Sequence, residues 1–323
     1  MRERLTRPVL ASSVCALALA LSGCSIKMMA INTLGNALSE GASNFASDDD
    51  PELIRGAVPF ALKTIEGLIE QSPKHKGLLT AAASGFTQYA YAFVQVEADY
   101  TEAQDLDRAT AMRTRAKKLY LRARDYGLRS FEVEFPGFRR RLGTDPDAAL
   151  ARTTKTHVPQ LYYTAAAWAA AFAIDKTDSR LSVDQSTIEK LMQRAIALDE
   201  SWELGSLHDF FVTWEGGRSS IGGSLEKARQ HFDRSLALSA GRRVAPFVTY
   251  AEVVSVGSQN KKEFQDLLTQ ALEVDTNKAP TQTLANIIGQ RRARWLLSRV
   301  DELFVEQPSP DGGSKSGPVD EYR

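Results

Sequence analysis

The sequence contains little of what thiol, metal or nucleic-acid functions require. Among its 323 residues there are two cysteines and four histidines, and 40 basic residues balance 40 acidic ones. Because the formal net charge is zero, the broad positive field that attracts nucleic acid is absent. Both cysteines fall within the first 24 residues, so the rest of the chain can form neither a disulfide nor a thiolate metal site. We therefore expect no nucleic-acid partner, no metal and no cofactor.

Long hydrophobic runs are also missing. An apolar run of 13 residues covers positions 9–21, whereas a membrane-spanning helix needs about 20. Three arginines precede this run and small residues follow it, which is the pattern of a secretory signal peptide. The run ends in the tetrad LSGC at residues 21–24, which resembles a bacterial lipobox. In a lipobox the cysteine thiol takes up diacylglycerol, and the mature chain begins at that cysteine.

The first 50 residues are therefore interpreted as a targeting and attachment segment. We expect residues 1–23 to be a cleaved lipoprotein signal peptide, Cys24 to carry the lipid, and residues 24–50 to form a tether or a weak first helix. Several acyl chains on one cysteine give stable attachment to a membrane leaflet. Ser25 replaces the aspartate that usually retains a lipoprotein in the inner membrane, which favours the inner leaflet of the outer membrane, facing the periplasm. A plain signal peptide, or a membrane anchor with a chance cysteine, is the alternative.

The remainder of the chain shows helical periodicity. Asp50 and Pro51 form a good helix start, because the carboxylate can cap free N–H groups and proline suits the first helical position. Apolar residues then recur at spacings of three and four, beginning with Leu53, Phe60 and Ile65, and no convincing strand pattern follows. The tail at 307–323 is rich in glycine, proline and serine and is expected to be disordered. The sequence predicts one all-α domain at 51–306.

Four helical segments share a pattern of a small or apolar residue, a large residue four positions later and a small one three positions after that. The last positions of these segments are 72, 40 and 36 residues apart, close to two, one and one periods of the roughly 34-residue tetratricopeptide repeat. We therefore predict an array of antiparallel helix pairs resembling degenerate tetratricopeptide repeats. The segments are Ala116/Tyr120/Ala123, Ile188/Met192/Ala195, Ala228/Phe232/Ser235 and Phe264/Leu268/Ala271.

Catalytic motifs are missing from this sequence. It contains neither a GxSxG nor an HExxH motif, and the glycine-rich stretch at 217–223 lacks the lysine of a phosphate-binding loop. The histidines are scattered without ligand spacing. His208, beside Leu207 and Phe210, is more typical of a hydrogen-bonded core or groove residue than of a catalyst. We do not expect an enzyme.

Aromatic residues are frequent on the helices, and two interpretations of them remain open. They either pack in the core or line a groove that recognises a peptide, a partner or an amphipathic ligand. The arginines of the last helix are equally open to two roles. They either form a solvated basic face that caps the array or bind an anionic group or a carboxylate-bearing partner.

Four phrases of the sequence together resemble a known family. They are LLTAAASGFTQYAYAF at 78–93, LYYTAAAW at 161–168, GGSLEKARQHF at 222–232 and LANIIGQRRARWLL at 284–297. In this order, and with the lipobox ahead of them, they resemble the T component of tripartite ATP-independent periplasmic (TRAP) transporters, the TatT lipoprotein family. The resemblance covers about residues 48–304.

The resemblance implies an all-helical lipoprotein that faces the periplasm and associates with a TRAP substrate-binding protein. It also implies a homotrimer with a central pore and a cleft that could accept a hydrophobic ligand, while the transport chemistry resides in other subunits. The family offers no catalytic residues to carry over. Groove residues for a ligand or partner are placed on Tyr89, Tyr163, Trp168, Asn286 and Arg291, and His208 is added as a groove candidate.

Two functions are compatible with the sequence. The first is a lipid-anchored adaptor that holds a TRAP substrate-binding protein and an apolar or organic-acid ligand in a groove. The second is an envelope scaffold lipoprotein that makes protein contacts and transports no ligand.

Overall fold

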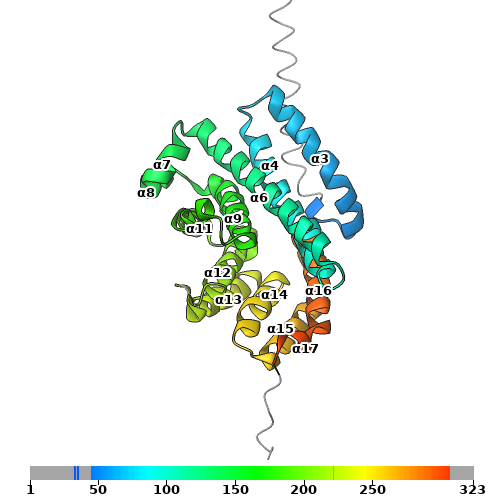
Figure 1. Cartoon of the computed structure of the whole chain (residues 1–323). Helices are drawn as coiled ribbons and strands as arrows, with labels where there is room; N and C mark the ends of the chain where they lie inside the picture. Colours follow the sequence, from blue (N-terminus) through cyan, green and yellow to red (C-terminus); the bar gives the residue numbers. More distant parts are fainter. Residues whose placement is uncertain (1–32, 34, 36–44, 221, 306–323) are drawn as a thin grey trace, which may run out of the picture.

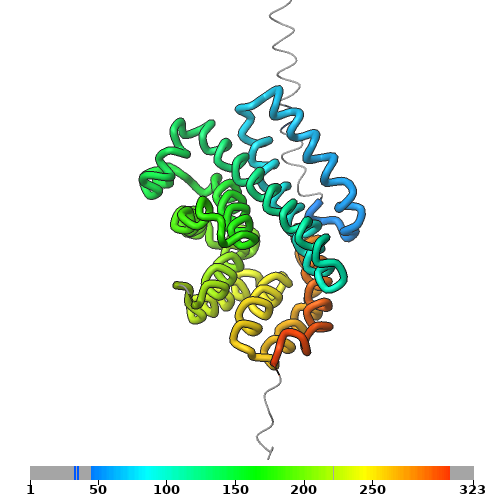
Figure 2. The backbone as a smooth tube through the Cα atoms, viewed as in Figure 1, coloured from blue at the N-terminus to red at the C-terminus, as the bar shows by residue number. Residues whose placement is uncertain are grey.

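The computed structural model describes residues 33, 35, 45–220 and 222–305, and every regular element in this part of the chain is helical. Consecutive helices follow a curved path, and the last long helix returns to the first (Figures 1 and 2). The predicted all-α fold is therefore confirmed. The signal peptide, Cys24 and the tail at 307–323 lie outside the described residues, and so does most of the predicted tether, so these predictions remain predictions.

The order of the elements is as follows. The first half contains α3 (Pro51–Gln71), α4 (Lys76–Ala90), the π-helical turn η1 (Tyr91–Gln95), α5 (Val96–Thr101), α6 (Leu106–Glu134), α7 (Phe138–Thr144), α8 (Pro146–Leu150), η2 (Lys155–His157), α9 (Val158–Ile174) and α10 (Ser179–Ser182). The second half contains α11 (Gln185–Asp199), η3 (Trp202–Gly205), α12 (Ser206–Gly216), α13 (Leu225–Ser239), α14 (Ala245–Tyr250), the π-helical turn η4 (Ala251–Ser255), α15 (Lys261–Glu273), η5 (Thr276–Lys278), η6 (Pro280–Gln282), α16 (Thr283–Ser298) and α17 (Val300–Leu303).

Helix α3 begins where the sequence predicts. The Asp50 carboxylate accepts hydrogen bonds from the backbone N–H groups of Glu52 and Leu53, both at 3.0 Å, and Pro51 is the first helical residue. The predicted apolar face is wrong in part, because Leu53 is 60% and Phe60 is 78% exposed. The helix carries apolar residues on two faces, and the partners α4 and α16 cover only one of them.

The repeated small-large-small pattern marks the buried faces of four helices. All twelve residues of the pattern are at most 2% exposed. They lie on α6, α11, α13 and α15, and each of these helices packs against a helix shortly before it in the chain: α4, α9, α12 and α14, respectively. The burial of these faces is thus as expected, while the tetratricopeptide-like arrangement of the pairs stays a prediction.

Two hydrophobic clusters form the core and meet at α12. One extends from α3 to α12 and includes Phe211 and Trp214, and the other extends from α12 to α17 and includes Val212. Close helix contact depends on small residues, most clearly at Gly127 of α6. A Cβ atom there would lie 2.1 Å from Thr164 Oγ1 of α9, so no larger residue fits without moving one of the helices.

Candidate functional site

Charged side chains join α16 to the beginning of the fold. Arg291 Nη1 lies 2.8 Å from Glu52 Oε1 of α3, and Arg292 Nη2 lies 3.0 Å from Asp99 Oδ2 of α5. Arg292 also pairs with Glu252 of η4. We call this group the closure cluster. Both arginines thus bind carboxylates of this same chain, a role that was not among the two predicted from the sequence, a solvated basic face and the binding of an anionic group or a carboxylate-bearing partner.

The two neighbouring arginines differ in environment. The Arg291 side chain is 43% exposed, whereas the Arg292 side chain is 8% exposed. The Arg292 guanidinium lies over the Trp295 ring, 4.3 Å from its centroid, and near Tyr100. Burial acts to lower the pKa of Arg292, but Glu252 and Asp99 outweigh it and hold the pKa above its usual value. Arg292 is therefore a permanent buried cation.

Two π-helical turns lie beside the closure cluster. One begins with Tyr91 and the other carries Glu252. Such turns insert an extra residue into a helix and are frequent at functional sites. The Tyr91 side chain is 50% exposed, yet desolvation, followed by the charge of Glu252, raises its pKa to about 12. The Glu252 carboxylate therefore lies close enough to the Tyr91 phenol to act on its charge state.

A second group of aromatic residues shows the same behaviour. Tyr162 and Tyr163 of α9 are half-buried, and desolvation raises the pKa of Tyr162 to about 12 and that of Tyr163 further. The Trp202 ring of η3 packs against both, at centroid distances of 4.9 Å and 6.0 Å. Gln88 Nε2 of α4 donates to Tyr163 Oη at 3.3 Å, which connects this group to the helix that precedes Tyr91.

Glu203 also combines solvent exposure with a pKa that is shifted by desolvation. It is exposed, and desolvation raises its pKa although Arg243 and Gln282 act to lower it. Gln282 Nε2, just before α16, donates to Glu203 Oε2 at 2.7 Å. The backbone φ angles of Glu203 and Leu204 are 47° and 55°, in the left-handed region that non-glycine residues rarely adopt. Strain of this kind is common where a side chain must be held in one direction.

We call these residues, together with Glu252, the inner face. Hydrogen bonds and ring contacts lead from α4 through α9 and η3 to η6, and the ion pairs of Arg292 join α16 to α5 and η4. It offers phenol rings, hydroxyl groups and carboxylates to a ligand. It contains no paired nucleophile and base. The residues are Tyr91, Tyr162, Tyr163, Glu203 and Glu252.

The structure places the six predicted groove residues in several different surroundings. Tyr163 lies on the inner face and Arg291 in the closure cluster. Tyr89 is half-buried beneath the guanidinium of Arg115, and Trp168 is 8% exposed beneath that of Arg124. Their proposed binding roles stay predictions.

Two of the six residues make buried hydrogen bonds. His208 Nδ1 lies 2.8 Å from His231 Nδ1, and His208 Nε2 lies 3.2 Å from Glu200 Oε1. Asn286 is 2% exposed, accepts from the Val244 N–H and donates to the carbonyl of Arg242, both at 2.9 Å. Asn286 thereby holds the start of α14.

Other residues of the site could not be found from the sequence. Glu203 and Glu252 lie in no recognisable motif, and the family phrases that contain Tyr91 and Arg292 give no sign of what these residues contact. The proximity of Tyr91, Glu252 and Arg292 depends on two π-helical turns and on the return of α16. Within the described ranges, no group of three or more histidine, cysteine, aspartate or glutamate residues could hold a metal ion. In the same part of the chain, no helix is long and apolar enough to cross a membrane.

The fold and site define an all-helical protein, in its described part, whose inner face carries phenols and carboxylates. The family model of the TRAP transporter T-component matches residues 47–304. A relative from Treponema pallidum (strain Nichols), named only as an uncharacterized protein, is 30% identical over 304 residues, which are 88% of this chain and 94% of the relative. The chain belongs to the TRAP transporter T-component family, as the sequence predicts. This family is associated with transport and is not a known enzyme family.

The pair formed by buried His208 and half-buried His231 predicts a pH dependence of stability. Desolvation lowers the pKa of both histidines, that of His231 to about 4. The unfolded chain binds protons near pH 6.5 and the folded chain does not, so stability will fall as the pH drops from 7 to 5. Glu200 stays charged in this range, because Arg234 lowers its pKa to about 2.

Urea unfolding of the wild type and of His231→Phe at pH 7, 6 and 5 measures this effect. His231 stacks on Phe211 at 4.8 Å, and phenylalanine preserves that contact. We expect the variant to lose less stability than the wild type between pH 7 and pH 5. Parallel curves for the two proteins would show that the pair does not titrate as described.

Proposed function

We propose that the protein is a lipid-anchored, periplasm-facing helical adaptor of a TRAP transport system. It associates with the TRAP substrate-binding protein and holds an apolar or organic-acid ligand on the inner face. The family membership supports the transport role, and the lipobox supports attachment through Cys24 to the inner leaflet of the outer membrane. We also propose that the helix pairs are arranged like tetratricopeptide repeats and that the protein forms a homotrimer.

The observation that carries the ligand part is the open but desolvated state of the inner-face phenols. Tyr91 and Tyr162 make no hydrogen bond from their hydroxyl groups to another described residue, although both lie in a desolvated surface. Desolvation strengthens a hydrogen bond formed there, and the rings supply apolar contact. A ligand with an apolar body and one hydrogen-bonding end matches this surface.

Co-purification tests the adaptor function. Full-length acylated protein in detergent is mixed with the purified substrate-binding protein of the same transport system, and the complex is measured by sedimentation. We expect a stoichiometric complex built on a trimer. If the two proteins sediment separately at micromolar concentration, the adaptor function is wrong, and an envelope scaffold without a transport partner takes its place.

Mass spectrometry of the extracted small molecules tests the ligand. We expect the wild type to retain a ligand that Tyr91→Ala/Tyr162→Ala loses by at least about tenfold. Phe60→Ala is the matched control, because it removes an exposed aromatic ring from α3, away from the inner face. Equal retention by all three proteins, or no ligand in the wild type, would exclude binding at the inner face.

A further inference from the structure

Helix α6 carries a row of exposed basic side chains that the inner face does not use. Four arginines recur every seven residues and one lysine stands between two of them. Because seven residues make two turns of helix, the row stays on one side of α6, with successive arginines about 10 Å apart and a total length of about 30 Å. We call this row the α6 ridge: Arg108, Arg115, Lys118, Arg122 and Arg129, all of them exposed.

The charges of the ridge are largely unpaired. Among the described residues, only Arg122 of the ridge has a carboxylate within ion-pair distance, Glu66 Oε1 at 3.5 Å. Other basic residues of the same helix behave differently. Arg113 pairs with Asp99 and Glu102, and Lys117 with two aspartates of the α9–α10 connection. The ridge is thus a positive strip on a chain whose total charge is zero.

Aromatic rings hold three of the arginines in place. The guanidinium carbons of Arg115, Arg122 and Arg129 lie 5.8 Å, 5.3 Å and 5.4 Å from ring centroids. The rings are those of Tyr89 and Phe86 of α4 and of Tyr126 of α6. A guanidinium stacked on a ring has lost part of its rotational freedom before a partner arrives, which reduces the cost of binding.

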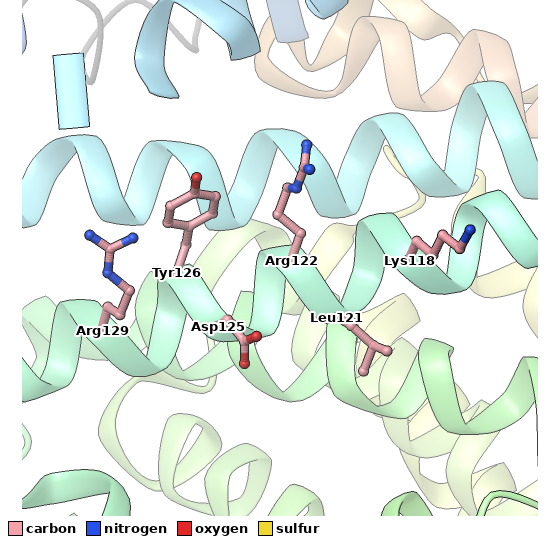
Figure 3. A pocket seen from close by; sticks show the side chains of 6 residues that line it. All are labelled: Lys118, Leu121, Arg122, Asp125, Tyr126 and Arg129. Atoms are coloured by element: carbon pink, nitrogen blue, oxygen red, sulfur yellow. The ribbon is translucent and has the colours of Figure 1, made fainter. Parts of the chain in front are cut away.

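A depression of about 430 Å³ lies along the C-terminal half of the ridge, from Lys118 to Arg129. Figure 3 shows Arg122, Tyr126 and Arg129 projecting from one side of α6, and Leu121 and Asp125 from the other. Asp125 is already bound by Arg124 and Arg139, so it does not neutralise the ridge. Arginine and tyrosine, which line this depression, are enriched among the central residues of protein interfaces.

We propose that the α6 ridge docks a partner protein through an acidic helix whose carboxylates repeat every seven residues. Such a helix has the same repeat distance as the ridge, so successive carboxylates meet successive guanidiniums. Arginine binds a carboxylate through two parallel hydrogen bonds, and four of the five ridge cations are arginines. A membrane surface has no fixed repeat, and the stacked side chains and the depression would not contribute to binding it. This proposal rests on the proposed function, because the partner to be tested is the TRAP substrate-binding protein.

Charge reversal tests the ridge. The ridge variant is Arg115→Glu/Lys118→Glu/Arg129→Glu. It keeps Arg122, so the ion pair between Arg122 of α6 and Glu66 of α3 is preserved. The control is Lys74→Glu/Lys176→Glu/Lys278→Glu, which makes the same change of net charge at exposed lysines that have no ion pair within the described residues and lie outside α6. Both variants, and a milder triple-alanine variant of the ridge, are titrated with the substrate-binding protein at two salt concentrations.

We expect the ridge variant to bind at least about 100-fold more weakly than the wild type, with a smaller salt dependence, and the control to bind within about threefold. If both variants bind as tightly as the wild type, the proposed docking through the α6 ridge is wrong, but the adaptor function is unaffected. If the wild type itself does not bind, the adaptor function fails. The ridge is then tested with a synthetic helical peptide carrying glutamates at every seventh position.

If only the ridge variant loses affinity for that peptide, the result supports the docking surface. If all variants bind the peptide with equal affinity, the proposal is wrong. Vesicles containing phosphatidylglycerol provide the last comparison. If the ridge variant loses vesicle binding but keeps its protein and peptide affinity, the ridge is a membrane contact and the proposal is wrong.

Discussion

Replacement of Arg292 by methionine will destabilise the protein by about 3 kcal/mol, whereas the same replacement of Arg291 will cost less than about 1 kcal/mol. The two arginines are adjacent on α16 and both bind carboxylates, so they form a matched pair that differs in burial. Removal of the buried cation leaves Glu252 without its partner and takes a guanidinium from the faces of Trp295 and Tyr100. Arg291 lies in solvent, where an ion pair with Glu52 contributes little.

Urea unfolding at pH 7 measures both variants. Hydrogen exchange adds a readout specific to the closure cluster, because its contacts connect the two ends of the described fold. We expect amides of α16 and η1 to exchange faster in Arg292→Met while those of α6 and α9 stay protected. If the two arginine variants are equally stable, the closure does not depend on the buried ion pair.

Replacement of Arg243 by methionine will cost about 3–5 kcal/mol, the largest single effect that we expect from a charged residue. Arg243 is 4% exposed and pairs with Asp209, whose carboxylate also accepts a hydrogen bond from Ser235 Oγ at 2.7 Å. The side chains belong to α12, α13 and the connection before α14, where the two hydrophobic clusters meet. The variant leaves the Asp209 charge nearly buried and without its cation.

Two controls define the origin of this loss. The double variant Arg243→Met/Asp209→Leu removes both charges and will recover much of the stability, because the unpaired carboxylate is the main cost. Arg234→Met breaks an ion pair with Glu200 at the surface and will have little effect. A double variant that is less stable than the single one would show that the pair itself, and not the orphaned charge, stabilises the fold.

Local features of the fold could be predicted because they depend on residues close together in the sequence. Asp50 caps α3 through the N–H groups of the next turn, and the small-large-small pattern identifies the buried face of a helix through its 3.6-residue period. The family could be recognised for a related reason, since its phrases lie on such helices. The exposed faces were harder to predict. Leu53 and Phe60 follow the apolar pattern of α3 and are nevertheless exposed. An apolar residue is buried only where a partner helix covers it.

The candidate site depended on contacts between distant residues. Arg291 and Arg292 have the same chemistry and adjacent positions, yet only the arrival of Asp99 and Glu252 makes one of them a buried cation. Tyr91 resembles any helical tyrosine until a π-helical turn and the return of α16 bring it near Glu252 and Arg292. The sequence by itself thus determined the helical character of the fold, the buried faces of four helices and the family. The tertiary structure decided which polar side chains meet, because long-range packing, and not local periodicity, sets the distances and the desolvation on which their chemistry depends.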